Sequence, residues 1–212
     1  MTTTLSAALA AMPVVAILRS SSADRFPEVA DTLRQGGIRA IEFTLTTPGV
    51  LAALREYTQD LPDGLTLGAG TVTTPHEAEA AVAAGAEYLI TPATQPEVIA
   101  EARRLGVPVL PGALTPTEIL TAWHAGASMV KLFPAAVGGP EYLRAVRAPL
   151  PGVPLVPTGG IDLDDAPGYL RAGATALGMG SPLVGDACES GNLSALADRT
   201  SRLVGLVTGA RG

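Results

Sequence analysis

Short apolar runs recur along the chain at intervals of roughly 19 to 26 residues, which is the length of one strand plus one helix. Most of these runs are apolar at nearly every position, as is typical of parallel strands covered on both faces. A helix-like segment follows each run except the last. The pattern predicts eight strands, which begin near Val14, Ala40, Thr66, Tyr88, Val107, Ser128, Pro154 and Ala174.

Polar residues followed by proline mark the starts of several predicted helices. A polar side chain caps the first turn of a helix, and proline suits the position after the cap. Four such pairs occur, namely Thr47-Pro48, Thr74-Pro75, Gln95-Pro96 and Thr115-Pro116. Each pair follows an apolar run, which supports the alternation of strands and helices.

Eight alternating units predict an α/β fold in which parallel strands close into a (β/α)8 barrel. A doubly wound open sheet is the alternative. One pattern covers the whole chain, so we expect a single domain over residues 1–212. A short helix over residues 3–11 precedes the first strand, and a last helix is expected from Leu193 to Val207.

Composition limits the kinds of partner. The net charge is −6 and basic residues form no cluster, which argues against nucleic acid. No apolar run reaches the roughly 18 residues that span a bilayer, so we expect no membrane contact and a cytoplasmic protein. Cys188 is the only cysteine, and His76 and His124 are the only histidines. We therefore expect neither a disulfide nor a metal, and no cofactor.

Lys131 is the only lysine, because the other thirteen basic residues are arginine. It lies in the apolar run Ser128–Pro134. An amine loses its proton and attacks a carbonyl to form a Schiff base, whereas a guanidinium stays charged. The alternative is a lysine at a strand end whose ammonium group reaches solvent.

In a barrel, catalytic groups gather at the carboxyl ends of the strands. Glu42 is a carboxylate within the run Ala40–Thr46, where alternation places it on one face with Thr44 and Thr46. It is a candidate general acid/base, or else an ion-pair partner of Arg19 or Lys131. The polar residues at the run ends are Arg19, Glu42, Thr44, Thr46, Thr71, Thr91, Lys131, Thr158 and Ser181.

Glycine-rich turns follow the last two runs. Gly159 and Gly160 come after Thr158, and Gly180 precedes Ser181. Such turns expose backbone N–H groups that bind anions, and loops after strands seven and eight are the usual phosphate site of barrels. The pattern favours a phosphorylated ligand over turn geometry alone.

Seven motifs make the chain resemble the class I 2-keto-3-deoxy-6-phosphogluconate aldolases from about Pro13 to Leu183. They cover residues 41–48, 68–72, 91–92, 111–118, 131–135, 157–161 and 178–181. The resemblance implies a homotrimeric (β/α)8 barrel that cleaves this phosphorylated sugar acid to pyruvate and D-glyceraldehyde 3-phosphate without a metal. Many members also act on 4-hydroxy-2-oxoglutarate.

The resemblance also implies roles for individual residues. Lys131 would form the Schiff base, and Glu42 would transfer protons. Thr71 would hold the pyruvate end of the substrate. Gly159, Gly160 and Ser181 would bind its phosphate end, and Thr158 and Gly180 are further candidates for substrate binding.

One position departs from the phosphogluconate-specific members, which have an arginine for the substrate carboxylate where this chain has Thr46. Here Arg19 follows the neighbouring first strand, as in the 2-keto-3-deoxy-6-phosphogalactonate aldolases. We expect Arg19 to supply the missing charge, which leaves the preferred C4 epimer open. The rival functions are a preference for 4-hydroxy-2-oxoglutarate, which gives pyruvate and glyoxylate, and a phosphosugar-binding barrel without activity.

Overall fold

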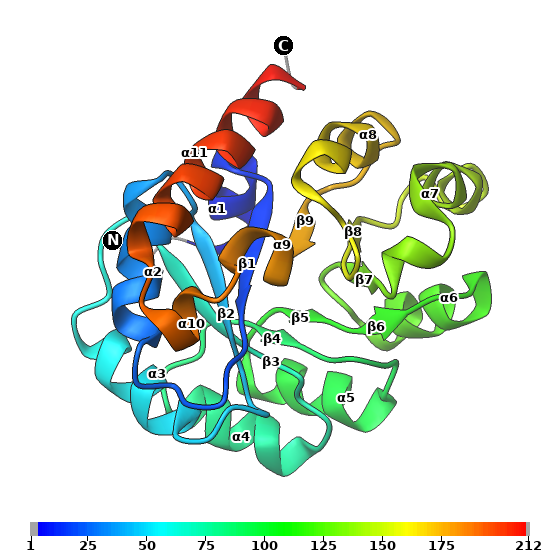
Figure 1. Ribbon diagram of the computed structural model, residues 1–212. Helices are drawn as coiled ribbons and strands as arrows, with labels where there is room; N and C mark the ends of the chain where they lie inside the picture. Colours follow the sequence, from blue (N-terminus) through cyan, green and yellow to red (C-terminus); the bar gives the residue numbers. More distant parts are fainter. Residues whose placement is uncertain (1–3, 211–212) are drawn as a thin grey trace.

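Strands and helices alternate along the computed structural model, which describes residues 4–210 (Figure 1). Each of the eight predicted runs contains a strand, so the alternation inferred from the apolar pattern is confirmed. The strands are β1 (Val14–Leu18), β2 (Ala40–Thr44), β3 (Thr66–Gly70), β4 (Leu89–Ile90), β5 (Val109–Leu110), β6 (Gly112–Ala113), β7 (Val130–Leu132), β8 (Leu155–Pro157) and β9 (Leu177–Met179).

The fifth run contains two strands because Pro111 separates β5 from β6. Proline has no N–H to donate to a neighbouring strand, but its carbonyl accepts from the N–H of Lys131 at 2.9 Å. All strand pairs are parallel. They form a curled six-stranded sheet in the order β5-β4-β3-β2-β1-β9 and a three-stranded sheet in the order β6-β7-β8. One isolated bridge joins Thr158, the residue after β8, to Gly178, the middle residue of β9.

The helices lie outside the strands and cover the sheets (Figure 1). Most of them follow a strand, as the alternating pattern of the sequence predicts. They are α1 (Leu5–Ala11), α2 (Phe26–Gln35), α3 (Val50–Gln59), α4 (Pro75–Ala83), α5 (Pro96–Leu105), α6 (Pro116–Ala125), α7 (Gly139–Arg147), α8 (Ala166–Arg171), α9 (Ser181–Val184), α10 (Ala187–Ser190) and α11 (Leu193–Gly209), with 3₁₀ turns η1 (Ala135–Val137) and η2 (Leu163–Asp165).

Three of the four predicted helix starts are confirmed. Thr74 and Thr115 each form a capping box, in which the hydroxyl accepts from the N–H three residues on and a glutamate returns the bond. Gln95 also precedes a helix, without a side-chain cap bond. The prediction at Thr47 is wrong, since α3 begins after Gly49. The Thr47 hydroxyl instead accepts a hydrogen bond from the Ser20 N–H, with 3.3 Å between N and Oγ1.

Helix α1 closes the end of the strands opposite to the polar run ends. Leu5, Ala8 and Leu9 are buried in one apolar cluster with strand residues such as Val15 and Val156. The predicted short N-terminal helix is therefore present from residue 5. Residue 3, where the prediction begins, lies outside the described residues.

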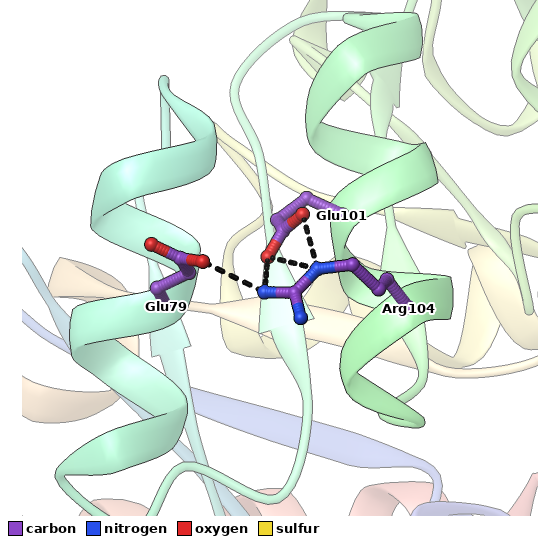
Figure 2. A network of polar contacts seen from close by, with 3 residues as sticks. All are labelled: Glu79, Glu101 and Arg104. Carbon is purple, nitrogen blue, oxygen red and sulfur yellow. Dashed lines mark hydrogen bonds and ion pairs between the residues drawn. The ribbon is translucent and has the colours of Figure 1, made fainter.

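Outer helices also contact each other through surface charges. Arg104 of α5 bonds Glu101 of the same helix and Glu79 of α4, with Arg104 Nη2 2.7 Å from a Glu79 oxygen (Figure 2). The Arg104 guanidinium lowers the pKa of Glu101. These side chains lie on the outer helices, and we assign them a structural role only.

Among residues 4–210, none of the helices combines the length and the apolar character needed to cross a membrane.

Candidate active site

A cavity of about 400 Å³ opens where the strands end, on the side away from α1. Its walls come from β1, β2, β7 and β9 and from the segments that follow β1, β3, β4, β7, β8 and β9. The residues predicted from the sequence that line it are Arg19, Glu42, Thr71, Lys131, Thr158, Gly159, Gly160, Gly180 and Ser181. The structure thus brings together residues that are up to 162 positions apart in the chain, from Arg19 to Ser181.

Lys131 is the middle residue of β7 and is 7% exposed. Its Nζ lies 4.9 Å from the centre of the Phe133 ring, a distance at which an aromatic face attracts a cation. Burial lowers the pKa of Lys131, Glu42 opposes that shift, and Arg19 adds to it. The lowered pKa increases the fraction of neutral amine, which is the nucleophilic form.

Glu42 is the middle residue of β2 and is 1% exposed. It is paired with Ile17 of β1 and Gly68 of β3. Burial raises the pKa of Glu42, while Lys131 and then Arg19 act to lower it. Its Oε2 accepts no hydrogen bond from residues 4–210. A carboxyl group with a raised pKa and a free oxygen is suited to both accept and donate a proton.

Arg19 and Thr71 meet at the mouth of the cavity. Arg19 Nη2 donates to Thr71 Oγ1 at 3.2 Å. Thr71 has φ of 60°, and within residues 4–210 it is the sole non-glycine residue with positive φ. A β-branched residue in this region is strained, and such strain persists where surrounding contacts fix the residue. The contact with Arg19 is one of them.

Backbone groups form the wall on the β8 and β9 side. The carbonyls of Thr158 and Gly159 accept from the N–H groups of Ala135 and Ala136, which fixes the turn after β8 against η1. Within residues 4–210 no acceptor is bonded to the N–H groups of Gly159, Gly160 or Gly180. These donors remain available for an anion.

The expectation that Thr46 lies beside Glu42 in the site is wrong. The strand ends at Thr44, and the chain turns, with the Thr47 N–H bonded to the Thr44 carbonyl at 3.0 Å. Thr46 is exposed and does not line the cavity. The alternation that grouped residues 42, 44 and 46 applies only while the chain remains extended.

Several lining residues are missed by reasoning from sequence, among them Ile17, Pro92, Phe133 and Pro182. Phe133 had a signal, because it stands two residues after Lys131 and strand alternation places such residues on one face. Ile17 lies within β1, Pro92 follows β4 and Pro182 lies in α9. No chemistry distinguishes these apolar and proline residues in the sequence.

The remaining reactive side chains lie elsewhere. His76 and His124 are exposed and outside the cavity. Burial raises the pKa of the Cys188 thiol to about 12, so little thiolate is present near neutral pH. Residues 4–210 contain no group of three or more histidine, cysteine or acidic side chains placed to hold a metal ion.

Known proteins are similar to this chain in sequence and in fold. The family model for KDPG and KHG aldolases matches residues 5–198. The 2-dehydro-3-deoxy-phosphogluconate aldolase of Pseudomonas aeruginosa is 41% identical over 160 residues, which cover 75% of this chain and 71% of that protein.

Two solved structures are similar along almost the whole chain. A native KDPGal structure has a TM-score of 0.89 and 29% identity, covering 94% of this chain and 96% of that one. The KDPG aldolase from Legionella pneumophila, with pyruvate captured at low pH as a covalent carbinolamine intermediate, has a TM-score of 0.84 and 32% identity. That match covers 94% of this chain and 97% of the other.

Proposed function

This chain belongs to the KDPG and KHG aldolase family, and on that premise we propose that it is a class I aldolase. Its substrate would be 2-keto-3-deoxy-6-phosphogluconate (KDPG) or the C4 epimer of this compound, cleaved to pyruvate and D-glyceraldehyde 3-phosphate. One observation carries the proposal. The only lysine of the chain and a buried carboxyl group, Glu42, line the same cavity.

The reaction begins with the amine of Lys131. In its neutral form Nζ attacks the keto carbon C2 of the substrate and gives a carbinolamine. Loss of water, with a proton delivered by Glu42, gives a protonated imine. Burial supports this step because it lowers the pKa of Lys131 and so supplies neutral amine.

Carbon–carbon cleavage then uses the imine as an electron sink. Glu42 removes the proton of the C4 hydroxyl, the C3–C4 bond breaks, and its electron pair forms an enamine with the iminium carbon. D-Glyceraldehyde 3-phosphate leaves. Glu42 returns a proton to C3, and water releases pyruvate and the free lysine. The raised pKa of Glu42 supports these transfers, because burial makes the protonated form of the carboxyl group easier to reach.

The two ends of the substrate would bind opposite walls. Arg19 and Thr71 would hold the carboxylate, as their hydrogen bond at the mouth supports. Thr158 and Ser181, with the N–H groups of Gly159, Gly160 and Gly180, would hold the phosphate. The unbonded N–H groups of the three glycines support this assignment. Thr46 has no part in this scheme because it lies outside the cavity.

The substrate preference is tested by pyruvate release from KDPG, its C4 epimer and 4-hydroxy-2-oxoglutarate. We expect the phosphorylated acids to have the higher kcat/KM, because they alone use the glycine-rich wall. A higher kcat/KM for 4-hydroxy-2-oxoglutarate contradicts the proposed substrate. No release from any of them contradicts an aldolase and favours a phosphosugar-binding barrel.

We propose further that the two sheets are parts of one closed (β/α)8 barrel. Only Pro111 separates β5 from β6, and the bridge from Thr158 to Gly178 joins the other edges. A crystal structure with an open gap between β8 and β9 contradicts closure.

As the family resemblance implies, we also propose a homotrimer. A cytoplasmic location fits a substrate with two anionic groups, a carboxylate and a phosphate, since charged groups cross membranes poorly. Cell fractionation tests this location.

A further inference from the structure

We propose that Gly70 is a positioning residue, whose lack of a side chain leaves the space that the Glu42 carboxyl group occupies. This inference rests on the proposed role of Glu42 as the acid/base. Gly70 does not itself line the cavity, so it acts through Glu42.

The backbone does not require glycine at this position. Gly70 is the last residue of β3, and its φ lies outside the left-handed region. It is paired with Thr44 on one side and Ile90 on the other, as any strand residue is. Glycine weakens a strand because it has no side chain to pack and is flexible when unfolded. The backbone conformation therefore does not explain why position 70 is glycine, and the explanation must come from a neighbouring side chain.

Glu42 provides that reason. The three heavy atoms nearest to a Cβ built on Gly70 all belong to Glu42, and the Cγ atom would be 2.5 Å away. The carboxyl carbon and Oε1 would overlap the added carbon still more closely. Real Cβ atoms essentially never come within 3.0 Å of such neighbours. Any side chain at position 70 therefore forces the carboxyl group out of its place.

The displaced carboxyl group has no alternative of equal quality. Glu42 is 1% exposed and surrounded by paired strands, so it must move further into the cavity or rotate about its own side chain. Either movement changes its position relative to Lys131 and to a bound substrate. Proton transfer requires the carboxyl oxygen within hydrogen-bond reach of the reacting group, so we expect catalysis to respond strongly.

Gly68, two residues earlier on the same strand, serves a different side chain. A Cβ on Gly68 would meet the ring of Tyr88, whose hydroxyl donates to the Ile41 carbonyl at 2.7 Å. The two glycines thus accommodate separate side chains, and only at Gly70 would an added Cβ meet the carboxyl group of the proposed acid/base.

The test is a double-mutant cycle of Gly70→Ala and Glu42→Ala, read by steady-state kinetics on KDPG and by thermal unfolding. We expect Gly70→Ala alone to lower kcat by about tenfold or more with a smaller change in KM. In the Glu42→Ala background, where the space is empty, the same methyl group should change the residual kcat by less than about twofold. An equal fall in both backgrounds, or a wild-type kcat in Gly70→Ala, overturns the proposal.

Thermal unfolding gives a second readout that needs no activity. Gly70→Ala should lower the unfolding temperature in the presence of Glu42 and leave it unchanged or higher in Glu42→Ala. If Gly70→Ala fails to fold, the double variant should fold, and failure of the double variant to fold overturns the proposal.

Gly36→Ala is the control for packing alone, because its methyl group would meet Thr200 of α11, remote from the cavity. It should lower the unfolding temperature equally in both backgrounds. A wild-type protein that cleaves none of the substrates contradicts the proposed function, while this unfolding cycle still tests Gly70.

Discussion

Burial opposes the charged forms of both Lys131 and Glu42, and their attraction for each other offsets only part of that effect. The pKa of the amine is lowered and that of the carboxyl group is raised. The two shifts bring the titration of both groups toward neutral pH. The proposed reaction needs a neutral amine and, at another step, a protonated carboxyl group. A lowered amine pKa and a raised carboxyl pKa favour these two forms.

The charges around Lys131 predict shifts of opposite sign in two variants. Glu42 raises the pKa of Lys131, so Glu42→Gln should lower it further. Arg19 lowers that pKa, so Arg19→Gln should raise it. The measurement is the pH dependence of acylation of the single lysine, followed by peptide mass spectrometry. Below its pKa the amine is protonated and unreactive, so the midpoint moves to lower pH in the first variant and to higher pH in the second. Shifts in the same direction contradict the assignment.

Arg19 should also control binding of the pyruvate end of the substrate. Its guanidinium is bonded to Thr71 at the mouth, and Thr46 is outside the cavity. We expect Arg19→Ala to raise the KM for KDPG and for pyruvate in the reverse reaction by about tenfold or more, which equals about 1.4 kcal/mol. Arg25→Ala is the control, because Arg25 pairs with Glu28 on the surface. An unchanged KM in Arg19→Ala shows that another group holds the carboxylate.

At the scale of elements, the wall near Ser181 depends on the last helix of the protein. Arg199 of α11 donates from Nε to the Leu183 carbonyl at 2.7 Å and from Nη2 to the Val184 carbonyl at 2.8 Å. These carbonyls are at the C-terminal end of α9, which begins with Ser181. A cation that bonds the last carbonyls of a helix stabilises that end. The position of Ser181 is thereby linked to α11.

We therefore expect Arg199→Ala to lower the free energy of unfolding by roughly 1.5–3 kcal/mol, the usual range for a hydrogen bond to a charged group. Because α9 borders the proposed phosphate site, the KM for KDPG should rise more than the KM for 4-hydroxy-2-oxoglutarate. Denaturant unfolding and steady-state kinetics measure the two effects.

Arg202→Ala is the comparison for this variant. Arg202 lies on the same helix and pairs with exposed Asp164, so its loss should cost less than about 1 kcal/mol. Equal effects of the two variants on stability, or equal KM changes for both substrates in Arg199→Ala, refute the link between α11 and the phosphate wall.

For the whole molecule, the sequence alone predicts the order of strands and helices, and it identifies Lys131 and Glu42 as the candidate reactive groups. Apolar runs predict strands reliably when both faces are covered, and all eight runs contain one. Lys131 and Glu42 were identifiable because each is a charged residue within such a run. Their common cavity then follows from the parallel direction of the strands.

What could not be predicted depends on where the chain leaves a strand. Thr46 was grouped with Glu42 by alternation, but β2 ends at Thr44 and the alternation stops there. The positive φ of Thr71 also could not be predicted. Local sequence does not determine it, because a contact that fixes Thr71 comes from Arg19, on a distant segment.

The proposed trimer is a prediction at this same scale. Sedimentation equilibrium at micromolar concentration should give three times the mass of one chain, and a single-chain mass contradicts it. Phe133 and Val137 are the large apolar side chains exposed within residues 4–210, and a neighbouring copy that covers them would protect their amides from hydrogen exchange.

Schiff-base formation is tested most directly by incubating the protein with pyruvate and borohydride and then measuring intact and peptide masses. Borohydride reduces an imine to a stable amine, and Lys131 is the only lysine. We expect a lactyl-sized adduct on the peptide that contains Lys131 and none in Lys131→Arg. A folded protein without an adduct, or with one only at the N-terminal amine, contradicts the proposed chemistry.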